Sequence, residues 1–296
     1  MSSEAVAVRK RSAGHRLAGL FHGRPRLQIG SLLAAPMAWL VILYLGSLLV
    51  LLVTAFWTVD PLSGSVIKEL SFDNFEELVN VPVYRDIIWR TVRTAILVTV
   101  TDAIIAFPIA FYMAKVASRR TKAMLVVAVL MPLWSSYLVK VLSWREMITE
   151  NGVVNWALAP LGLHGPGEGL VAVWLVMSYL WLPYMILPIF AGLERIPNSL
   201  ISASEDLGAS PFTTFRRVIL PLAFPAVVAG SIFTFSLTLG DYIAPALVSN
   251  DQFIGTTIRA SITNNQPFAA ALALVPIVVV IAYLGVARRL GAFEHV

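Results

Sequence analysis

The sequence predicts an all-α membrane protein with six transmembrane helices, and three observations lead to that prediction. Hydrophobic residues make up 58% of its 296 residues and charged residues 13%, whereas about 25% of the residues in a soluble domain are charged. The mean hydropathy is +0.78. Six apolar stretches also meet or approach the ~20 residues that a helix needs to cross a hydrocarbon core about 30 Å thick. We therefore expect lipid to surround most of the chain.

The six apolar stretches are separated by short polar connections. To within a few residues at each end, the predicted spans are 33–57, 92–114, 123–144, 169–192, 222–248 and 268–287. The fourth and sixth contain no charged residue, while Lys140 interrupts the third. Between the first two spans, residues 71–79 place apolar side chains at helical spacing among acidic ones, which predicts a short helix packed over the bundle.

The distribution of basic residues predicts the orientation. Residues 1–30 form a basic tail that is too long and too charged for a cleavable signal peptide. Basic residues also gather at 115–122, at 195–217 and after residue 287, whereas charged residues within 60–90 are mostly acidic. Because basic connections tend to face the cytoplasm, we expect the tail and both termini there. Residues 31–296 are then one transmembrane domain.

Several classes of function are disfavoured by what the sequence lacks. The chain has no Cys, which removes thiol catalysis and Cys-ligated metals, and its four His residues lie in tails or loops. It contains no Gly-x-x-x-x-Gly-Lys-Ser/Thr phosphate loop, and its basic residues flank apolar runs instead of forming a stripe. We expect no enzyme activity, no metal site, no cofactor held by this chain and no nucleic-acid partner.

The connection at 195–221 is the most informative segment. Asn198 or Ser199 is a suitable N-cap for a short helix that runs to Leu207, and Gly208 supplies the left-handed residue that ends it. Ser210 followed by a proline then predicts a second short helix, from 211 to about 219. Two short helices that meet at Gly208 form a rigid elbow facing the cytoplasm, which is typical of a docking element.

The acidic pair Glu205 and Asp206 lies at the end of the first short helix, where the helix dipole disfavours negative charge. Basic groups of a partner would compensate that charge. The alternative is that both side chains are simply solvated.

This elbow resembles the EAA loop of ABC-importer permeases, whose pattern is Glu-Ala-Ala, three residues, Gly, nine residues, Ile, one residue and Leu-Pro. The residues that match its spacing are Ala203, Gly208, Leu220 and Pro221. Val218 stands at the Ile position, while Ser202 and Ser204 replace the Glu and the second Ala. Loss of the Glu puts an ion pair at that position in doubt, and the elbow itself survives.

Four further runs resemble the spermidine/putrescine permeases of the PotB-like type. They are PLWSSYLVK at 132–140, ENGVVN at 150–155, LPYMILP at 182–188 and LGDYIAP at 239–245. The resemblance covers about residues 30–290. It implies the ABC-importer permease fold in a bacterial plasma membrane, with a second permease chain in a heterodimer, two cytoplasmic ATPase chains that bind ATP and Mg²⁺, and an extracytoplasmic binding protein.

The resemblance also implies which residues couple the chain to the ATPases. The residues assigned to coupling are Ser202, Ala203, Glu205, Asp206, Gly208, Ala209, Ser210 and Phe212. Movement of the docked elbow is expected to drive alternating access of the bundle.

Ionisable groups at bilayer depth are costly and each needs a reason. Asp241 follows Gly240 and precedes Pro245, which predicts a break in the fifth helix at this point, and we expect Asp241 to line the translocation path with Tyr242, Trp134 and Tyr184. Carboxylates and aromatic faces suit the ammonium groups of a polyamine. The alternative is a buried packing role for Asp241. Asp102 is expected to be a hydrogen-bonding group inside the bundle.

Three rival functions remain open at this point. An importer of this type could carry another solute, such as thiamine, ferric iron or a phosphonate. A secondary transporter or channel would need no ATPase partner and would usually contain inverted repeats, which we do not find. An intramembrane aspartyl protease would pair Asp241 with Asp102, but Thr238 occupies the first Gly position of its Gly-x-Gly-Asp motif.

Overall fold

The computed structural model describes residues 25–289, and nearly all of its regular structure is helical. The helices are α2 (Pro25–Leu40), η1 (Val41–Leu45), α3 (Gly46–Thr54), α4 (Asp73–Asn80), α5 (Pro82–Phe111), η2 (Tyr112–Val116), α6 (Arg119–Trp134), α7 (Tyr137–Ile148), α8 (Val153–Leu158), η3 (Ala159–Leu161), α9 (Leu170–Arg195), α10 (Asn198–Asp206), α11 (Pro211–Thr214), η4 (Phe215–Ile219), α12 (Leu220–Gly240), α13 (Ile243–Val248), α14 (Ile254–Ser261) and α15 (Gln266–Arg289). Strands β1 (Thr58–Val59) and β2 (Val66–Ile67) pair antiparallel.

The chain divides into two compact units after Val53. In the first unit, α2, η1 and α3 follow one another without a break, and Leu32–Thr54 is apolar and long enough to cross a membrane. This helix matches the first predicted span. Most of the predicted basic tail, 1–24, lies outside the described residues, while helix α2 already begins at Pro25.

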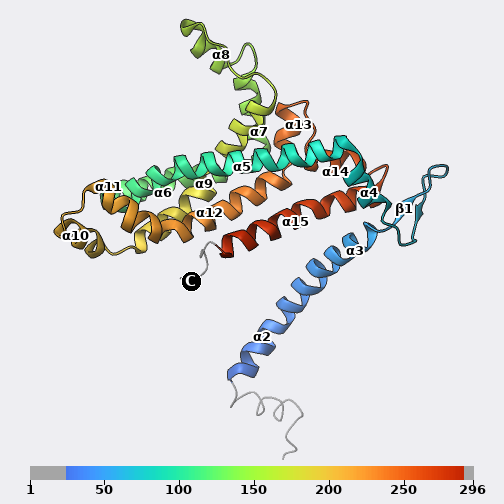
Figure 1. Cartoon of the computed structure of the whole chain (residues 1–296), viewed down its shortest axis with the longest axis horizontal. Helices are drawn as coiled ribbons and strands as arrows, with labels where there is room; N and C mark the ends of the chain where they lie inside the picture. The colour runs from blue at the N-terminus through green and yellow to red at the C-terminus, as the bar shows by residue number, and fades with distance from the viewer. Residues whose placement is uncertain (1–24, 290–296) are drawn as a thin grey trace, which may run out of the picture. The chain divides into compact units, whose positions relative to one another are not determined.

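The second unit is a bundle in which α5, α9 and α12 each pack against the other two, and α15 packs along α12 (Figure 1). Helix α9 lies at its centre, because side chains such as Met177, Met185 and Leu193 are fully buried. Four helical stretches of this unit are long and apolar enough to span a membrane, namely Pro82–Val116, Leu170–Arg195, Pro211–Gly240 and Gln266–Arg289. The predicted all-α membrane fold is thereby confirmed.

The third predicted span, 123–144, is not one straight helix. Helices α6 and α7 meet at an angle of 92° across Ser135 and Ser136. The carbonyl of Pro132, freed where α6 ends, accepts hydrogen bonds from the Ser135 hydroxyl (2.9 Å) and from Lys140 Nζ (3.1 Å). A cation at a helix C-terminus is favourable, so Lys140 stabilises the bend. Hydropathy summed along the chain did not reveal this change of direction.

The fifth predicted span, 222–248, also has different limits. Helices α11, η4 and α12 form one continuous stretch from Pro211 to Gly240. The second short helix of the elbow is therefore the first part of the membrane helix, not a separate element. At the other end, the helix breaks at Asp241, as predicted from the glycine before it and the proline after it, and the chain restarts as α13.

The short helix predicted at 71–79 is present as α4, and it packs against α5 and α15. Asn74 is buried and donates to the carbonyls of Ala55 (2.9 Å) and Trp57 (2.7 Å). Phe72 and Phe75 contact the ring of Phe56, with centroids 5.4 and 5.1 Å away. These contacts fasten α4 to the segment that follows α3.

Candidate coupling elbow and translocation site

The first half of the elbow is helix α10, whose last residue is Asp206, one residue before the predicted end, and Gly208 follows as the predicted left-handed residue. Gly208 has φ +80°, in the left-handed region that costs an L-residue about 1–2 kcal/mol. Its N–H donates to the carbonyl of Glu205 (2.8 Å), and the N–H of Ala209 donates to that of Ser204 (3.1 Å). Glycine at this position therefore closes the helix and reverses the chain without strain.

The second half of the elbow begins with the predicted cap. The Ser210 hydroxyl accepts from the N–H of Thr213 (3.3 Å), with Pro211 at the first helical position. The hydroxyls of Ser204 and Thr214 are hydrogen-bonded across the bend (2.9 Å), and Thr214 is buried. The serine that replaces the second Ala of the EAA pattern thus holds the two helices of the elbow together.

The predicted N-cap of α10 is wrong by one residue. The residue before the helix is Pro197, and neither Asn198 nor Ser199 caps it. The Asn198 amide oxygen instead accepts from Lys115 Nζ (3.2 Å), which also donates to the carbonyl of Ile196 (2.5 Å). The Asn198 side chain therefore binds Lys115, which is distant in sequence, and does not form the N-cap hydrogen bond that the local sequence predicted.

Lys115 ties the elbow to the bundle, and Lys122 ties α6 to the end of α9 just before the elbow. Lys115, in η2, binds the start of α10 as just described, and Lys122 in α6 forms an ion pair with Glu194 (2.8 Å). From the sequence, these lysines indicated only that the connection at 115–122 faces the cytoplasm. Their contacts depend on the packing of α6 and η2 against the end of α9, which no local motif encodes.

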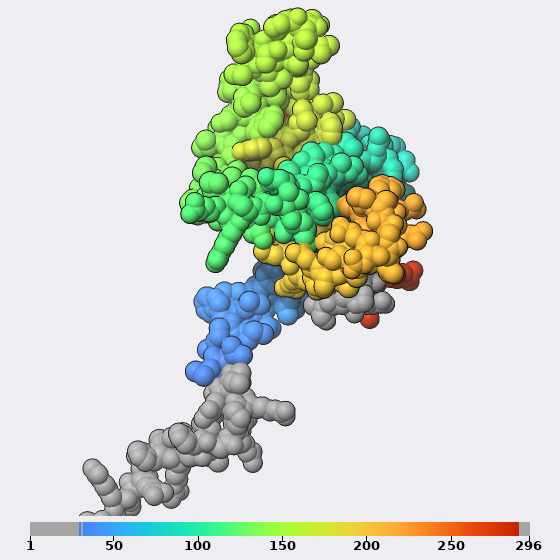
Figure 2. Space-filling model, turned by 90° about the vertical axis from the view of Figure 1, so that its left-hand side faces the viewer, coloured from blue at the N-terminus to red at the C-terminus, as the bar shows by residue number. Residues whose placement is uncertain are grey.

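The outer surface of the elbow carries large apolar side chains. Leu207 is 88% exposed and Phe212 is 70% exposed. The acidic pair Glu205 and Asp206 is exposed too, with no ion pair within residues 25–289. Of the remaining residues assigned to coupling, Ser202, Ala203 and Ser210 are exposed and Ala209 is half-buried. In Figure 2 this end of the second unit faces the viewer, with the elbow in yellow and orange.

Asp241 lies in the break between α12 and α13 and is held by protein groups. One carboxylate oxygen accepts from the N–H of Ile243 (2.9 Å) and of Ala244 (3.3 Å). The other accepts from the hydroxyl of Tyr137, at the start of α7. The carboxylate thus caps α13 and links it to the bent third span.

Tyr137 belongs to a row of three aromatic rings. It stacks on Trp181 with centroids 5.9 Å apart, and Trp181 meets Tyr184 edge-on, also at 5.9 Å. The structure thus connects two predicted path residues, Asp241 and Tyr184, through two residues that sequence reasoning missed. We call Tyr137, Trp181 and Tyr184 the aromatic row. The signal for the aromatic row in the sequence was that Trp181 and Tyr184 lie on successive turns of one predicted helix.

The other two predicted path residues lie apart from the aromatic row. Tyr242 is 37% exposed and packs under the guanidinium of Arg259, at 5.3 Å from the ring centroid. Trp134 ends α6 beside the bend and is 84% exposed, without a ring contact in the described part of the chain. The structure therefore brings together only part of the predicted set.

Asp102 is fully buried on α5, inside the bundle as predicted. Its carboxylate interacts with the side chain of Ser178 on α9, although no hydrogen bond of standard length and angle joins the two within residues 25–289. The predicted interior position is therefore present, and Ser178 is the polar side chain that Asp102 faces.

Comparison with known proteins places this arrangement in a family. Residues 89–292 match the family described as "Binding-protein-dependent transport system inner membrane component". The chain is 45% identical to the inner membrane ABC transporter permease protein YdcU of Escherichia coli over 94% of this chain and 95% of that protein. It is 29% identical to the spermidine/putrescine transport system permease protein PotB of Haemophilus influenzae, over 80% and 85% of the two chains.

A solved structure has the same fold. It is a bacterial alginate ABC transporter in complex with an alginate pentasaccharide-bound periplasmic protein, with a TM-score of 0.68 at 16% identity over 92% of this chain and 98% of that chain. Because the family match covers most of the sequence, this chain belongs to the binding-protein-dependent transport system inner membrane components. It is a multi-pass inner-membrane ABC-importer permease, a transport subunit and not an enzyme, and ATP hydrolysis belongs to a separate subunit.

Proposed function

We propose that this permease imports polyamines, such as spermidine and putrescine, or a related small cationic solute, by alternating access. The aromatic row with the Asp241 carboxylate at its end carries this proposal. A polyamine is a chain of ammonium groups on methylenes, and such groups bind to aromatic faces and to carboxylates. The similarity to a spermidine/putrescine permease supports the same solute class.

The negative charge of the Asp241 carboxylate favours a cationic solute over a phosphonate, which is one of the alternative solutes. A carboxylate beside aromatic faces attracts an ammonium group and repels a phosphonate. Asp241 is occupied by Tyr137 and by the start of α13 in the conformation described here. Binding of a solute ammonium group therefore requires Tyr137 to move, which fits a path that opens only in part of the transport cycle.

The proposed assembly contains this chain, a second and different permease chain, two ATPase chains and an extracytoplasmic binding protein. The alginate transporter, which was solved with its periplasmic protein, supports such a partner. The positive-inside bias supports a cytoplasmic elbow and cytoplasmic termini. Exposed Leu207 and Phe212 fit a groove on the ATPase, because large exposed apolar side chains mark interaction sites.

The test is reconstitution of the purified complex in proteoliposomes. We expect an ATPase to co-purify, its activity to rise with the loaded binding protein, and labelled putrescine or spermidine to enter the vesicles. Absence of an ATPase partner would contradict the proposed assembly. Uptake of a phosphonate or thiamine without uptake of either polyamine would contradict the solute.

Leu207→Asp is expected to reduce the amount of co-purified ATPase by tenfold or more. A carboxylate at the centre of an apolar contact is desolvated without a partner, which costs about 2 kcal/mol or more. Leu62→Asp is the matched control, because Leu62 is 97% exposed in the turn between β1 and β2 and lies far from α10 in the sequence. Pull-down with quantified subunit ratios measures the effect, and equal ratios for both variants would exclude Leu207 from the contact.

A further inference from the structure

Two arginines near the start of α5 have no role in the proposed function. Arg90 and Arg93 lie toward the end of the bundle opposite the elbow, since the other end of this span holds Lys115, which binds the base of α10 (Figure 1). The span Pro82–Val116 has 35 residues, and at about 1.5 Å per residue it exceeds a hydrocarbon core of about 30 Å by some 20 Å. A centred span therefore places these arginines at the boundary between head groups and acyl chains.

Cations at this end run against the positive-inside bias, and a charge at membrane depth is costly without a partner. Arg90 has one, because its Nη1 lies 3.4 Å from the Asp251 carboxylate and donates to the carbonyl of Gln252 (3.1 Å). Arg93 is exposed and forms no hydrogen bond or ion pair within residues 25–289. A fixed positive charge is thus left open at the membrane boundary.

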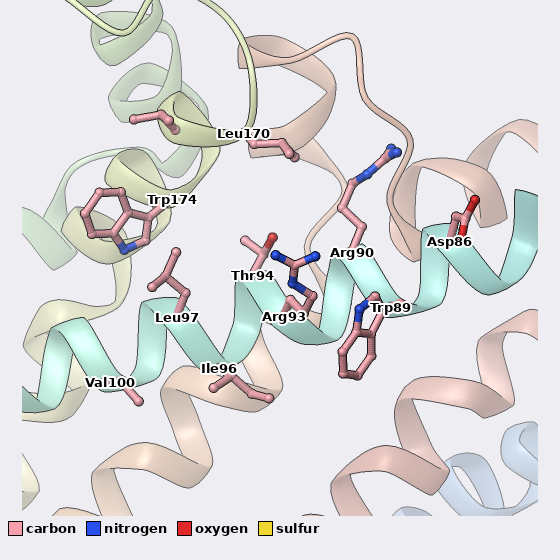
Figure 3. Close-up of a pocket in the computed structure, with 11 residues that line it drawn as sticks. Asp86, Trp89, Arg90, Arg93, Thr94, Ile96, Leu97, Val100, Leu170 and Trp174 are labelled. Carbon is pink, nitrogen blue, oxygen red and sulfur yellow. The ribbon is translucent and has the colours of Figure 1, made fainter.

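Beside Arg93, the surface between α5 and the first turns of α9 is hollowed by about 630 Å³. Figure 3 shows the charged side chains at one end of this groove and Leu97 and Val100 farther along α5. Leu97 and Val100 are 49% and 50% exposed. Across the groove, Trp174 of α9 donates from Nε1 to the hydroxyl of Thr101 (3.0 Å).

Along α5, the lining of the groove changes from charged to apolar, as a lipid leaflet does from its head groups to its acyl chains. Arginines lie at its outer end, exposed aliphatic side chains lie toward the membrane interior, and Trp89 is exposed at the boundary, where indole rings are common. Asp251 compensates the charge of Arg90, and Asp86 lies about two turns from Arg93 toward the helix start, so Arg93 is the cation of the lining that has no ion pair within residues 25–289. An unpaired guanidinium beside the groove favours an anion.

We propose that this groove binds an anionic phospholipid of the leaflet opposite the elbow, with its phosphate on Arg93 and one acyl chain along Leu97 and Val100. A guanidinium matches the geometry of a phosphate and forms paired hydrogen bonds with it. The apolar floor selects a lipid over free phosphate, and the positive charge disfavours a cationic solute. The proposal rests on the membrane fold and not on the identity of the solute.

The test uses the full-length permease, purified in detergent with the subunits that accompany it, in the wild-type form and as Arg93→Gln. Native mass spectrometry counts bound phosphatidylglycerol, and thermal unfolding is followed with added phosphatidylglycerol, phosphatidylethanolamine or inorganic phosphate. Arg85→Gln is the matched control, because Arg85 is exposed at the same end of α5 but does not line the groove. Leu97→Asn tests the acyl-chain contact with both arginines intact, should Arg93→Gln fail to fold.

We expect Arg93→Gln to retain at least fivefold less phosphatidylglycerol than the wild type and to lose the stabilisation by this lipid. Arg85→Gln should keep both properties, and Leu97→Asn should lose part of the bound lipid. Equal retention by Arg93→Gln and the wild type would overturn the proposal. So would the same stabilisation by inorganic phosphate alone, or loss of the second permease chain from Arg93→Gln with unchanged lipid, since the groove would then be a subunit contact.

Discussion

Gly208→Pro is expected to reduce solute uptake at least tenfold while the amount of folded permease in the membrane stays the same. Proline fixes φ near −65° and has no N–H, whereas Gly208 has φ +80° and donates to the carbonyl of Glu205 (2.8 Å). The space around its Cβ position is open, so the damage is confined to the backbone of the elbow. Uptake and ATPase activity measured on the same vesicles report it, and hydrolysis should no longer respond to the loaded binding protein.

Gly64→Pro provides the matched control. Gly64 also has a positive φ, +67°, open space at its Cβ position and an N–H that donates over 2.8 Å, here to Asp60. It lies in the turn between β1 and β2 and belongs to no predicted coupling contact. We expect this variant to transport normally. Full uptake by Gly208→Pro would show that the elbow does not transmit the action of the ATPase.

Asp241→Asn is expected to reduce polyamine uptake by about tenfold or more with little change in thermal stability. The amide oxygen still accepts from the N–H groups of Ile243 and Ala244, so the cap of α13 survives. The negative charge is lost, and the new NH2 group faces the Tyr137 oxygen, which can accept from it. A hydrogen bond to a charged group contributes about 1.5–3 kcal/mol. Uptake kinetics for putrescine, together with the unfolding temperature of the purified protein, separate the charge from the cap.

Tyr137→Phe tests the hydrogen bond to Asp241 separately from the stacking within the aromatic row. It removes the hydroxyl that binds Asp241 but keeps the ring that stacks on Trp181. We expect uptake within about threefold of the wild type, because the carboxylate becomes free while the aromatic row persists. Wild-type uptake by Asp241→Asn would restrict Asp241 to the capping of α13 and remove it from the translocation path.

The sequence predicted well where a feature depends on neighbouring residues. The spans follow from apolar content summed over about 20 residues, since that sum sets the free energy of transfer into lipid. The elbow follows from Gly208 and from Ser210 with the proline after it, because backbone conformation at a helix end depends on the side chains at that end. These features needed no knowledge of the fold.

Features that join distant residues escaped prediction. The partner of Asp241 is Tyr137, 104 residues away, and the partner of Asn198 is Lys115, 83 residues away. The sequence also placed Trp134 with Asp241 in the path, although it is 84% exposed beside the bend. Such pairs arise only when helices from different parts of the chain pack, and hydropathy carries no information about which faces meet.

Local sequence thus predicted a membrane bundle, the approximate positions of its spans and an elbow that bends at Gly208, because these features depend on transfer energies and backbone preferences of neighbouring residues. The 92° bend between α6 and α7, the continuity of the elbow with α12 and the hydrogen bonds that hold Asp241 were visible only in the folded chain. The same is true of Arg93, which stays without a protein partner in the described chain beside an apolar groove. Packing between helices far apart in sequence sets both the direction of each helix and the residues that its side chains contact.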